Sequence, residues 1–522
     1  MTRALWPLSG LVLLSGCQVA PPERSSWSYT VEPQVPERFA LSGIETSTAL
    51  NPVHVLGESP SADDEGVDAP AASIELDDVL HSVEQHFPLV LAAREEIAVA
   101  EGELLAAQGG FDTQALGDGK SKTGFYDYDR VDLLFEQPTT LWGATFGAGY
   151  RWGGGDFAVY DGEEKSNKKG EFRVGMSVPL LQNRAIDKRR VNLWKARLER
   201  DRADPVVLEQ RILSLLDAAR VYWAWVAAGR QREVAVRLLA LAEDRMDQIT
   251  EAAEKGLLAG INIKDNQRLI VDRRAKLAAA ERKLQNAGIK LSLFWRDAEG
   301  QPRVPGNDQL PYEFPPTRPA EEVLLDDDEA FALAHRPEIV NAELKLEQLR
   351  LEGELQANRL LPKLDFGVFA SQDFGAASNT PDDKEDLEVE ATLKFELPIQ
   401  RREARGGVRR VEARTNQLEF KLDFTREKVR ASVQDARSAL LLSWVRIGEM
   451  RENARLAVEL AEAERVRLGL GASDLFRVNL REVQAAAAAA NLIDVLSEYF
   501  LAMAGYRASL GLPYELDDAL EE

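Results

Sequence analysis

Hydrophobic and polar residues alternate along several segments of the chain, which is the pattern of β-strands with two different faces. In WGATFGAGYRW, residues 142–152, every even position carries an aromatic residue or alanine, and every odd position carries glycine, threonine or arginine. EFRVGMSVPL, KLDFGVFAS and LEVEATLKFEL alternate in the same way, and RVDLLFEQP does so more weakly. The pattern predicts up to six strands, at about 111–122, 130–137, 142–152, 171–180, 363–371 and 387–397.

Most of the remaining chain carries apolar residues at three- and four-residue spacing, which is typical of amphipathic helices. A first helical pattern begins near residue 74 and ends at Gly109 and Gly110. Long helical patterns cover 185–296 and 403–511, and a glycine-rich interruption in each predicts a tight turn between two antiparallel helices. A helix over 405–468 is about 95 Å long, so such rods must pack along one another. A kink or restart is expected at Pro205.

These elements recur in the same order, which predicts a twofold internal repeat. Asp77 to Pro88 has the spacing of Asp326 to Pro337, and the VPLLQNRAIDKRRV and LPIQRREARGGVRRV segments also match. In each half, the pattern predicts a helix, strands, a long helix, a glycine turn and a second helix antiparallel to the first long one. The predicted parts are a first repeat at 73–310, a proline-rich connector at 311–325, a second repeat at 326–513 and an acidic tail at 514–522.

The beginning of the sequence is typical of an export signal, with Arg3 ahead of a short apolar stretch that ends in LSGC. This ending resembles the lipobox of bacterial lipoproteins. The resemblance implies that residues 1–16 are removed and that Cys17 is acylated, palmitate being one of the acyl groups. An ordinary signal peptide with an incidental cysteine is the alternative, although Cys17 is the only cysteine of the chain. Residues 17–72, rich in Pro, Ser and Glu, predict an extended tail.

Charge and hydropathy narrow the class of protein. The net charge of −23 over 522 residues argues against nucleic acid as a partner, because phosphate requires a basic surface. After the signal no run of about 18 apolar residues occurs, so no transmembrane helix is predicted. A chain of this kind can span a membrane only as a closed β-barrel. Small barrels need about eight strands, so several chains must contribute to one barrel.

Two alternatives follow from the patterns alone. A water-soluble sheet on a core shows the same alternation as a membrane strand, and a plain helical bundle or coiled coil shows the same helical spacing.

Candidate catalytic and metal-binding motifs are weak. GDGKS at 117–121 lacks the first glycine of a phosphate-binding loop, since Gln114 stands in its place. His81 and His86 are five residues apart and fall on different faces of a helix, which disfavours a zinc site. No Ser-His-Asp or Cys-His set is recognisable. We therefore expect no enzyme activity, no cofactor and no metal.

The twofold order of elements, RPEIVNAELKLEQLRLEGELQANRLLPKLDFGV and the two glycine-centred hairpins resemble the outer-membrane efflux protein (TolC) family over about residues 74–513. The resemblance implies a mainly α fold with a membrane β-barrel portion, in which long antiparallel helices form a periplasmic α-barrel below outer-membrane strands. It implies a homotrimer that serves as the exit duct of a tripartite efflux pump or type I secretion system. The partners would be a periplasmic adaptor, an inner-membrane transporter and outer-membrane lipid. A lipid-anchored periplasmic coiled-coil scaffold without a pore is the alternative.

The resemblance also implies roles for particular residues. Helical tips that contact the adaptor are expected at Gly256, Leu257, Gly469 and Leu470. Asp265 and Asp474 are candidates for a pore constriction, where carboxylates favour cations; the alternative is that both are helix N-caps or solvated surface residues. Trp142, Phe146, Tyr150 and Trp152 are expected on the lipid-facing side of a strand. The first strand region is the longer one, and its extra segment predicts either a further hairpin, giving 18 strands per trimer rather than 12, or an external loop.

Overall fold

A computed structural model describes residues 73–158, 165–376 and 387–514 of the chain. The predicted export signal, Cys17 and the tail lie outside the described residues. The chain forms two compact units. Unit 1 contains Ala98–Arg202 and Glu343–Phe420, and unit 2 contains Ala203–Ala342 with the described parts of Val31–Ile97 and Lys421–Glu522. Four of the described helices contribute residues to both units: α2 (Pro88–Gln108), α3 (Lys188–Glu254), α7 (Pro337–Asn358) and α8 (Arg402–Gly469).

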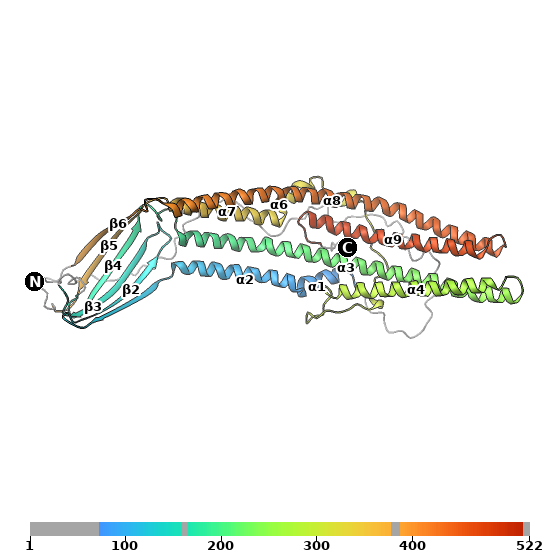
Figure 1. Cartoon of the computed structure of the whole chain (residues 1–522), viewed down its shortest axis with the longest axis horizontal. Coiled ribbons are helices and arrows are strands. Elements are labelled where there is room, and N and C mark those ends of the chain that lie inside the picture. Colours follow the sequence, from blue (N-terminus) through green and yellow to red (C-terminus); the bar gives the residue numbers. More distant parts are fainter. Residues whose placement is uncertain (1–72, 159–164, 377–386, 515–522) are drawn as a thin grey trace, which may run out of the picture. The chain divides into compact units, whose positions relative to one another are not determined.

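Unit 1 contains a single six-stranded sheet in the order β1-β2-β3-β4-β5-β6, in which every neighbouring pair is antiparallel (Figure 1). Its strands are β1 (Gln114–Lys122), β2 (Tyr128–Pro138), β3 (Thr145–Gly155), β4 (Glu171–Pro179), β5 (Lys363–Asp373) and β6 (Glu388–Glu396). All six predicted strands therefore form. The longer first strand region supplies β2 and β3 as a hairpin within the sheet, and not as an external loop.

The start of β3 differs from the prediction. Trp142 lies in the turn before the strand, because the backbone at Trp142 and Gly143 has φ of 53° and 70° and cannot continue an extended chain. A Cβ at position 143 would lie 2.7 Å from the carbonyl oxygen of Asn183, so only glycine fits there. The Trp142 ring lies 5.9 Å from the guanidinium of Arg184. The assignment of Trp142 to a strand is wrong.

Each of the two shorter helical segments is divided in two. The helices are α1 (Leu76–His86), α2 (Pro88–Gln108), α6 (Asp328–His335) and α7 (Pro337–Asn358). Both divisions come one residue before a proline, at Phe87 and Arg336, where ψ is 122° in each case. Proline disfavours helical backbone in the residue before it and suits the first turn of the helix that follows. The sequence therefore ends one helix and begins the next at the same step in both segments.

The long helices pair as α3 (Lys188–Glu254) with α4 (Ile261–Leu291) and α8 (Arg402–Gly469) with α9 (Leu475–Ser509) (Figure 1). Short elements fill the connections: η3 (Gly109–Phe111), η5 (Asn307–Gln309) and α5 (Ala320–Val323). Helix α3 runs through Pro205 without interruption, so the expectation of a restart is wrong, and the alternative of a kink stays a prediction. Proline removes one backbone hydrogen bond, and a helix held by packing along its length tolerates that loss.

Each unit has its own apolar core. In unit 2, Trp223 stacks on Phe500 with ring centroids 4.5 Å apart, and Phe314 stacks on both. Alanines of α9 allow close approach to α3 next to this cluster, where Ala227, Ala486 and Ala489 are buried together. In unit 1, a second cluster joins the start of α3 to α7 and contains Ile186, Val191, Leu351 and Leu355.

Among the described helices, α9 alone is long and apolar enough to cross a membrane by length and composition. Half of its apolar stretch is buried inside the chain. The core helix of a water-soluble fold has the same property, so we treat α9 as a packed helix of unit 2.

Candidate functional site

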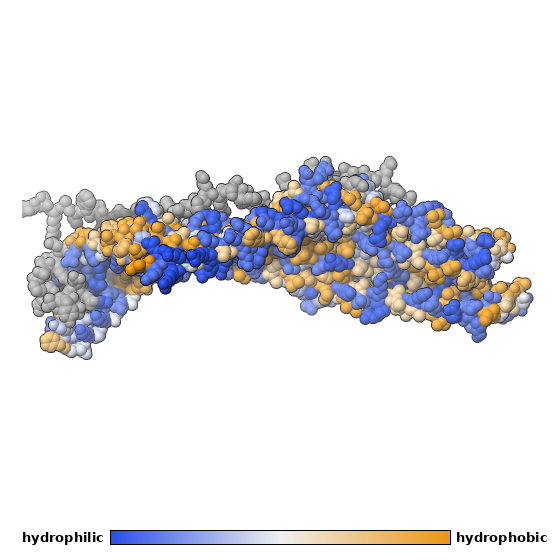
Figure 2. Space-filling view, turned by 45° about the horizontal axis from the view of Figure 1, so that its top comes forward, coloured by the Kyte–Doolittle hydropathy of each residue, from blue (hydrophilic) through white to orange (hydrophobic). Residues whose placement is uncertain are grey.

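The register of the sheet sorts its side chains into two chemically different faces. Large hydrophobic side chains from β2 to β6 share one side, which we call the apolar face. They are Val131, Leu133, Phe135, Phe146, Tyr150, Trp152, Phe172, Val174, Met176, Phe366, Val389, Leu393 and Phe395, each between 37% and 65% exposed. Figure 2 shows apolar side chains gathered on the part of the chain that carries the strands. Such a face is far larger than the isolated apolar residues of an ordinary protein surface.

Three of the predicted lipid-facing residues lie on the apolar face. Phe146, Tyr150 and Trp152 project from β3, at exposed fractions of 45%, 44% and 39%. Cross-strand partners continue the same chemistry, because Tyr150 lies between Leu133 and Phe172 in the register.

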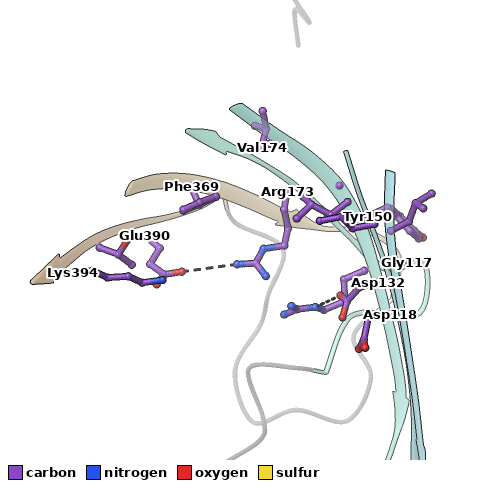
Figure 3. A pocket seen from close by; sticks show the side chains of 16 residues that line it. Gly117, Asp118, Asp132, Tyr150, Arg173, Val174, Phe369, Glu390 and Lys394 are labelled. Carbon is purple, nitrogen blue, oxygen red and sulfur yellow. Dashed lines mark hydrogen bonds and ion pairs between the residues drawn. The ribbon is translucent and has the colours of Figure 1, made fainter. Parts of the chain in front are cut away.

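The opposite side of the sheet, which we call the ionic face, carries a row of ion pairs. From β1 to β6 the row runs Asp118, Arg130, Asp132, Arg151, Glu171, Arg173 and Glu390, with successive N–O distances of 2.7, 2.8, 2.6, 3.9, 3.6 and 3.9 Å. Arg173 of β4 reaches across β5 toward Glu390 of β6 (Figure 3). Each arginine of the row lies between two carboxylates, so the positive charges are locally balanced.

A hollow of about 450 Å³ lies against the ionic face. Asp118, Asp132, Arg173, Glu390 and Lys394 line it, together with Leu116, Leu134, Phe369 and glycines of β1 and β3 (Figure 3). Charged groups at this density require water or paired neighbours. The sheet therefore has one side suited to an apolar medium and one side suited to water.

The two long hairpins of unit 2 turn in the same way. In the first, Gly256 has φ of +71° and its N–H donates to the carbonyl of Ala253, while the N–H of Leu257 donates to Ala252. In the second, Gly471 has φ of +71° and makes the equivalent bond to Leu468. Both turns are Schellman motifs, which end a helix with a glycine in left-handed conformation.

Both predicted turns form, and the contact of Gly256, Leu257, Gly469 and Leu470 with an adaptor stays a prediction. Gly256 is the left-handed glycine of the first tip. In the second tip that position belongs to Gly471, whereas Gly469 is the last residue of α8. Two glycines flank Leu470 in the sequence, and the later one, Gly471, is the one that follows the end of the helix.

The tips expose apolar side chains. Leu257 and Ile261 are 76% and 64% exposed at the first tip, and Leu470 and Phe476 are 78% and 75% exposed at the second. The two turns lie at the same end of unit 2 (Figure 1). Exposed apolar side chains at the same end of both hairpins are suited to contact with a protein partner.

The two constriction candidates differ in their surroundings. The Asp474 carboxylate caps α9, accepting a hydrogen bond of 2.9 Å from the backbone N–H of Arg477, and its other oxygen lies 3.5 Å from the Arg477 side chain. Asp265 is exposed on the second turn of α4. Capping thus accounts for Asp474 within one chain, and the constriction role of both residues stays a prediction.

A buried ionic cluster joins all four helices near the tips. Glu482 of α9 is fully buried and accepts hydrogen bonds from Arg245 of α3, from Arg273 of α4 at 3.1 Å and from Arg465 of α8 at 3.2 Å. Arg245 also donates to Asn479 at 2.5 Å. One carboxylate therefore connects both hairpins.

The ionisation of Glu482 follows from this geometry. Burial alone would raise the pKa of its carboxyl, but the hydrogen bonds and charges of Arg245 and Arg273 outweigh burial, and the pKa lies below its ordinary value. The prediction of functional residues from the sequence missed this cluster, although the sequence carries a signal for it. Glu482 occupies a core position of α9, in line with the buried residues Val478, Ala485 and Ala489.

Within the described residues, no group of three or more His, Cys, Asp or Glu side chains is placed to hold a metal ion. His81 lies on α1 and bonds to Gln85 at 2.6 Å, so it belongs to a local helix contact. The geometry of the chain is that of a two-faced sheet and paired helices.

Comparison with known proteins addresses the fold. No protein-family model and no curated protein matches the sequence. The outer membrane protein VceC of Vibrio cholerae is similar in structure, with a TM-score of 0.59, 15% identity, and coverage of 84% of this chain and 97% of VceC. The outer membrane channel MtrE of Neisseria gonorrhoeae, in its open state, has a TM-score of 0.58 and 13% identity, with coverage of 88% of this chain and 96% of MtrE. The outer membrane channel CmeC of Campylobacter jejuni has a TM-score of 0.58 and 12% identity, with coverage of 92% of this chain and 96% of CmeC.

The chain therefore has the fold of outer-membrane channel proteins, which is the TolC-type fold that the sequence predicted. The likeness covers most of this chain and nearly all of each channel.

The Glu482 cluster leads to a stability prediction. Glu482→Gln leaves three guanidinium groups without their shared carboxylate, and loss of one partner from a buried ionic cluster costs about 3 kcal/mol or more of unfolding free energy. Because the pKa of Glu482 lies below the ordinary 4.5, its stabilisation is present above that pH and is lost as the pH falls below it. We expect the Glu482→Gln variant to have a lower thermal midpoint than the native protein at pH 7, measured by circular dichroism. As the pH falls below 4.5, the midpoint of the variant should fall less than that of the native protein.

Glu452→Gln is the matched control. Glu452 bonds to Arg455 on the surface of α8 with half of its side chain exposed, so little change is expected. Equal midpoints for the Glu482 variant and the unchanged protein at pH 7 would contradict the role of the cluster.

Proposed function

We propose that the protein is an outer-membrane channel, the exit duct of a tripartite efflux pump or type I secretion system. The observation that carries the proposal is the two-faced sheet. Its apolar face suits acyl chains and its ionic face suits a water-filled lumen. The fold shared with MtrE and CmeC, both described as outer membrane channels, supports this.

Strand length agrees with a membrane-spanning role. The six strands have 9 or 11 residues each, and tilted strands of about 9–11 residues cross a bilayer. A water-soluble sheet would bury its hydrophobic side, whereas Leu393 and Phe395 remain 64% and 65% exposed in the chain. These exposed fractions favour contact with lipid.

One chain cannot form the channel by itself. The sheet ends at β1 and β6, which do not pair with each other, and open strand edges are not tolerated in hydrocarbon. We infer that several copies close one barrel, and the resemblance to TolC-type proteins implies three. With the β2–β3 hairpin inside the sheet, three copies supply about 18 strands, at the large end of the barrels that enclose open channels.

The paired helices supply the periplasmic part of the proposed duct. The exposed side chains at the two tips, Leu257, Ile261, Leu470 and Phe476, are the surface that we assign to a periplasmic adaptor. Energy for transport would come from an inner-membrane transporter, and the channel itself would be passive, without catalytic activity or cofactor. Which solute or protein it carries depends on that transporter.

Membrane insertion separates the channel from the scaffold without a pore. Ala148 lies on the apolar face of β3 and Gly147 on the ionic face, where an added Cβ meets no atom closer than 3.6 Å. Arginine facing lipid near the bilayer midplane costs about 2–4 kcal/mol. We expect Ala148→Arg to prevent assembly in the outer membrane, while Gly147→Arg assembles and conducts less current in planar bilayers. If the purified native protein does not conduct, and if both variants assemble to the same extent, the scaffold without a pore is supported.

The proposed constriction can be tested apart from helix capping. Asparagine caps a helix about as well as aspartate, so Asp474→Asn removes the charge and keeps the cap, whereas Asp474→Ala removes both. If carboxylates restrict the pore, we expect the Asn variant to raise the leak conductance of the closed channel. Asp265→Asn tests the second candidate in the same assay. A current that changes only in the Ala variant would assign Asp474 to capping alone.

We further propose that Cys17 is acylated and anchors the protein in the outer membrane, as the LSGC motif predicts. In cells fed a labelled fatty acid, the native protein should incorporate label and Cys17→Ala should incorporate none. Labelling that persists in the variant would refute the lipoprotein assignment and leave the channel proposal intact.

A further inference from the structure

The two edge strands of the sheet are built alike. Strands β1 and β6 have nine residues each, and every one of these residues except Thr392 is largely exposed. Because all neighbouring strands in the sheet are antiparallel and the sheet has six, β1 and β6 run in opposite directions. Strand β6 of one copy can therefore form an antiparallel pair with β1 of a second copy.

We propose that β6 of one copy pairs with β1 of the next in a single register, with Glu396 opposite Gln114 and Glu388 opposite Lys122. This proposal rests on the proposed channel and specifies how its copies join. The register pairs all nine residues of one edge with all nine of the other. It also keeps the two faces continuous, which a shift of one residue would reverse.

Charge on the ionic face favours this register over one of the two neighbouring registers. It sets Lys120 opposite Glu390 and Lys122 opposite Glu388, while Lys394 lies diagonal to Asp118. Opposite charges on facing strand positions stabilise a pair, and like charges destabilise it. A shift of two residues in one direction would set Asp118 opposite Glu390, so charge disfavours that register. A shift of two residues in the other direction would set Asp118 opposite Lys394 and Lys122 opposite Glu390, so charge alone does not exclude it. Within one chain, the Nζ atoms of Lys120 and Lys122 lie 5.3 and 5.6 Å from the ring centroid of Tyr128 on the neighbouring strand β2.

The apolar face is complementary as well. Strand β1 presents small residues there, Ala115, Gly117, Gly119 and Ser121, and β6 presents Val389, Ala391, Leu393 and Phe395. The register sets Phe395 opposite Ala115 and Leu393 opposite Gly117. Large side chains beside glycine cover the exposed backbone of an edge strand.

The strand tilt adds a geometric constraint. A path that steps from each residue to its opposed partner, from β1 across the sheet to the β1 of the next copy, arrives at a different residue of β1 from the one where it started. The number of residues between these two positions sets the tilt of the strands in a closed barrel. Three sheets joined in this register have strands tilted by about 35°, within the range of about 35–45° for membrane barrels. The shift that opposes Asp118 to Glu390 would give only about 25°. A shift of two residues the other way gives about 45° but leaves Glu388 and Gln114 without partners.

Disulfide formation between copies tests the register. A disulfide requires Cα atoms about 4.4–6.8 Å apart, which directly opposed residues satisfy and diagonal ones do not. In the full chain, Lys120→Cys with Glu390→Cys should give covalently linked trimers on a denaturing gel after mild oxidation. A link within one chain would leave the protein at the monomer position of the gel, so the trimer band itself shows that the link joins copies.

Two pairs represent the alternative registers: Lys122→Cys with Glu390→Cys, and Lys120→Cys with Glu388→Cys. Linked trimers from either of these, and not from the proposed pair, would overturn the register while leaving the barrel intact. Charge reversal is a second measurement. Lys120→Glu should lower the temperature at which the trimer dissociates, and Lys120→Glu with Glu390→Lys should restore it.

The channel and the register fail in different ways. A protein that is monomeric, does not conduct and gives no link in any pair would overturn the channel proposal itself. A conducting trimer without links in the proposed pair, and without rescue by the double reversal, would overturn the register alone.

Discussion

Hydrocarbon cannot satisfy the hydrogen bonds of an exposed strand edge, and this constraint organises the proposed assembly. The sheet of unit 1 has an apolar face that water does not favour, and two edges that lipid does not tolerate. In the proposed assembly, lipid covers the apolar face, and pairing between successive copies satisfies the hydrogen bonds of the edges. Folding of one chain and joining of several are then parts of a single energetic balance, as in other oligomers whose subunits are incomplete alone.

Ionic interactions serve different purposes in the two units. On the sheet, the row from Asp118 to Glu390 is partly exposed to water, so its pairs are worth little individually and mainly keep charge balanced beside the hollow. Near the tips, Glu482 is excluded from water and shared by three arginines. There the loss of one partner is costly, and the cluster specifies how the two hairpins pack against each other.

Much of the fold could be predicted because it depends on short repeating patterns. Alternation of residues identified five of the six strands, β2 to β6, and glycine positions identified both tips. The errors lie where local geometry overrides a pattern. Trp142 continues the alternation, yet the left-handed turn with Gly143 excludes it from the strand. Pro205 suggested a break, yet packing carries α3 through it.

The candidate site was less accessible to prediction than the fold. Phe146, Tyr150 and Trp152 could be placed because a strand has only two faces. The row of ion pairs depends on how six strands align, and nothing in one strand determines that. The Glu482 cluster brings together residues from four helices that are up to 237 positions apart in the sequence. A glutamate in an apolar helical stripe signals burial, but its three partners become identifiable only in the folded chain.

The composition of the ion-pair row has a consequence for cargo. The row holds four carboxylates and three arginines, so each copy leaves one negative charge in excess in this row of the ionic face. The lumen of the proposed duct would then attract cations weakly and would not attract anions. Any stronger sorting of what leaves the cell would fall to the narrower helical end and to the proteins docked there.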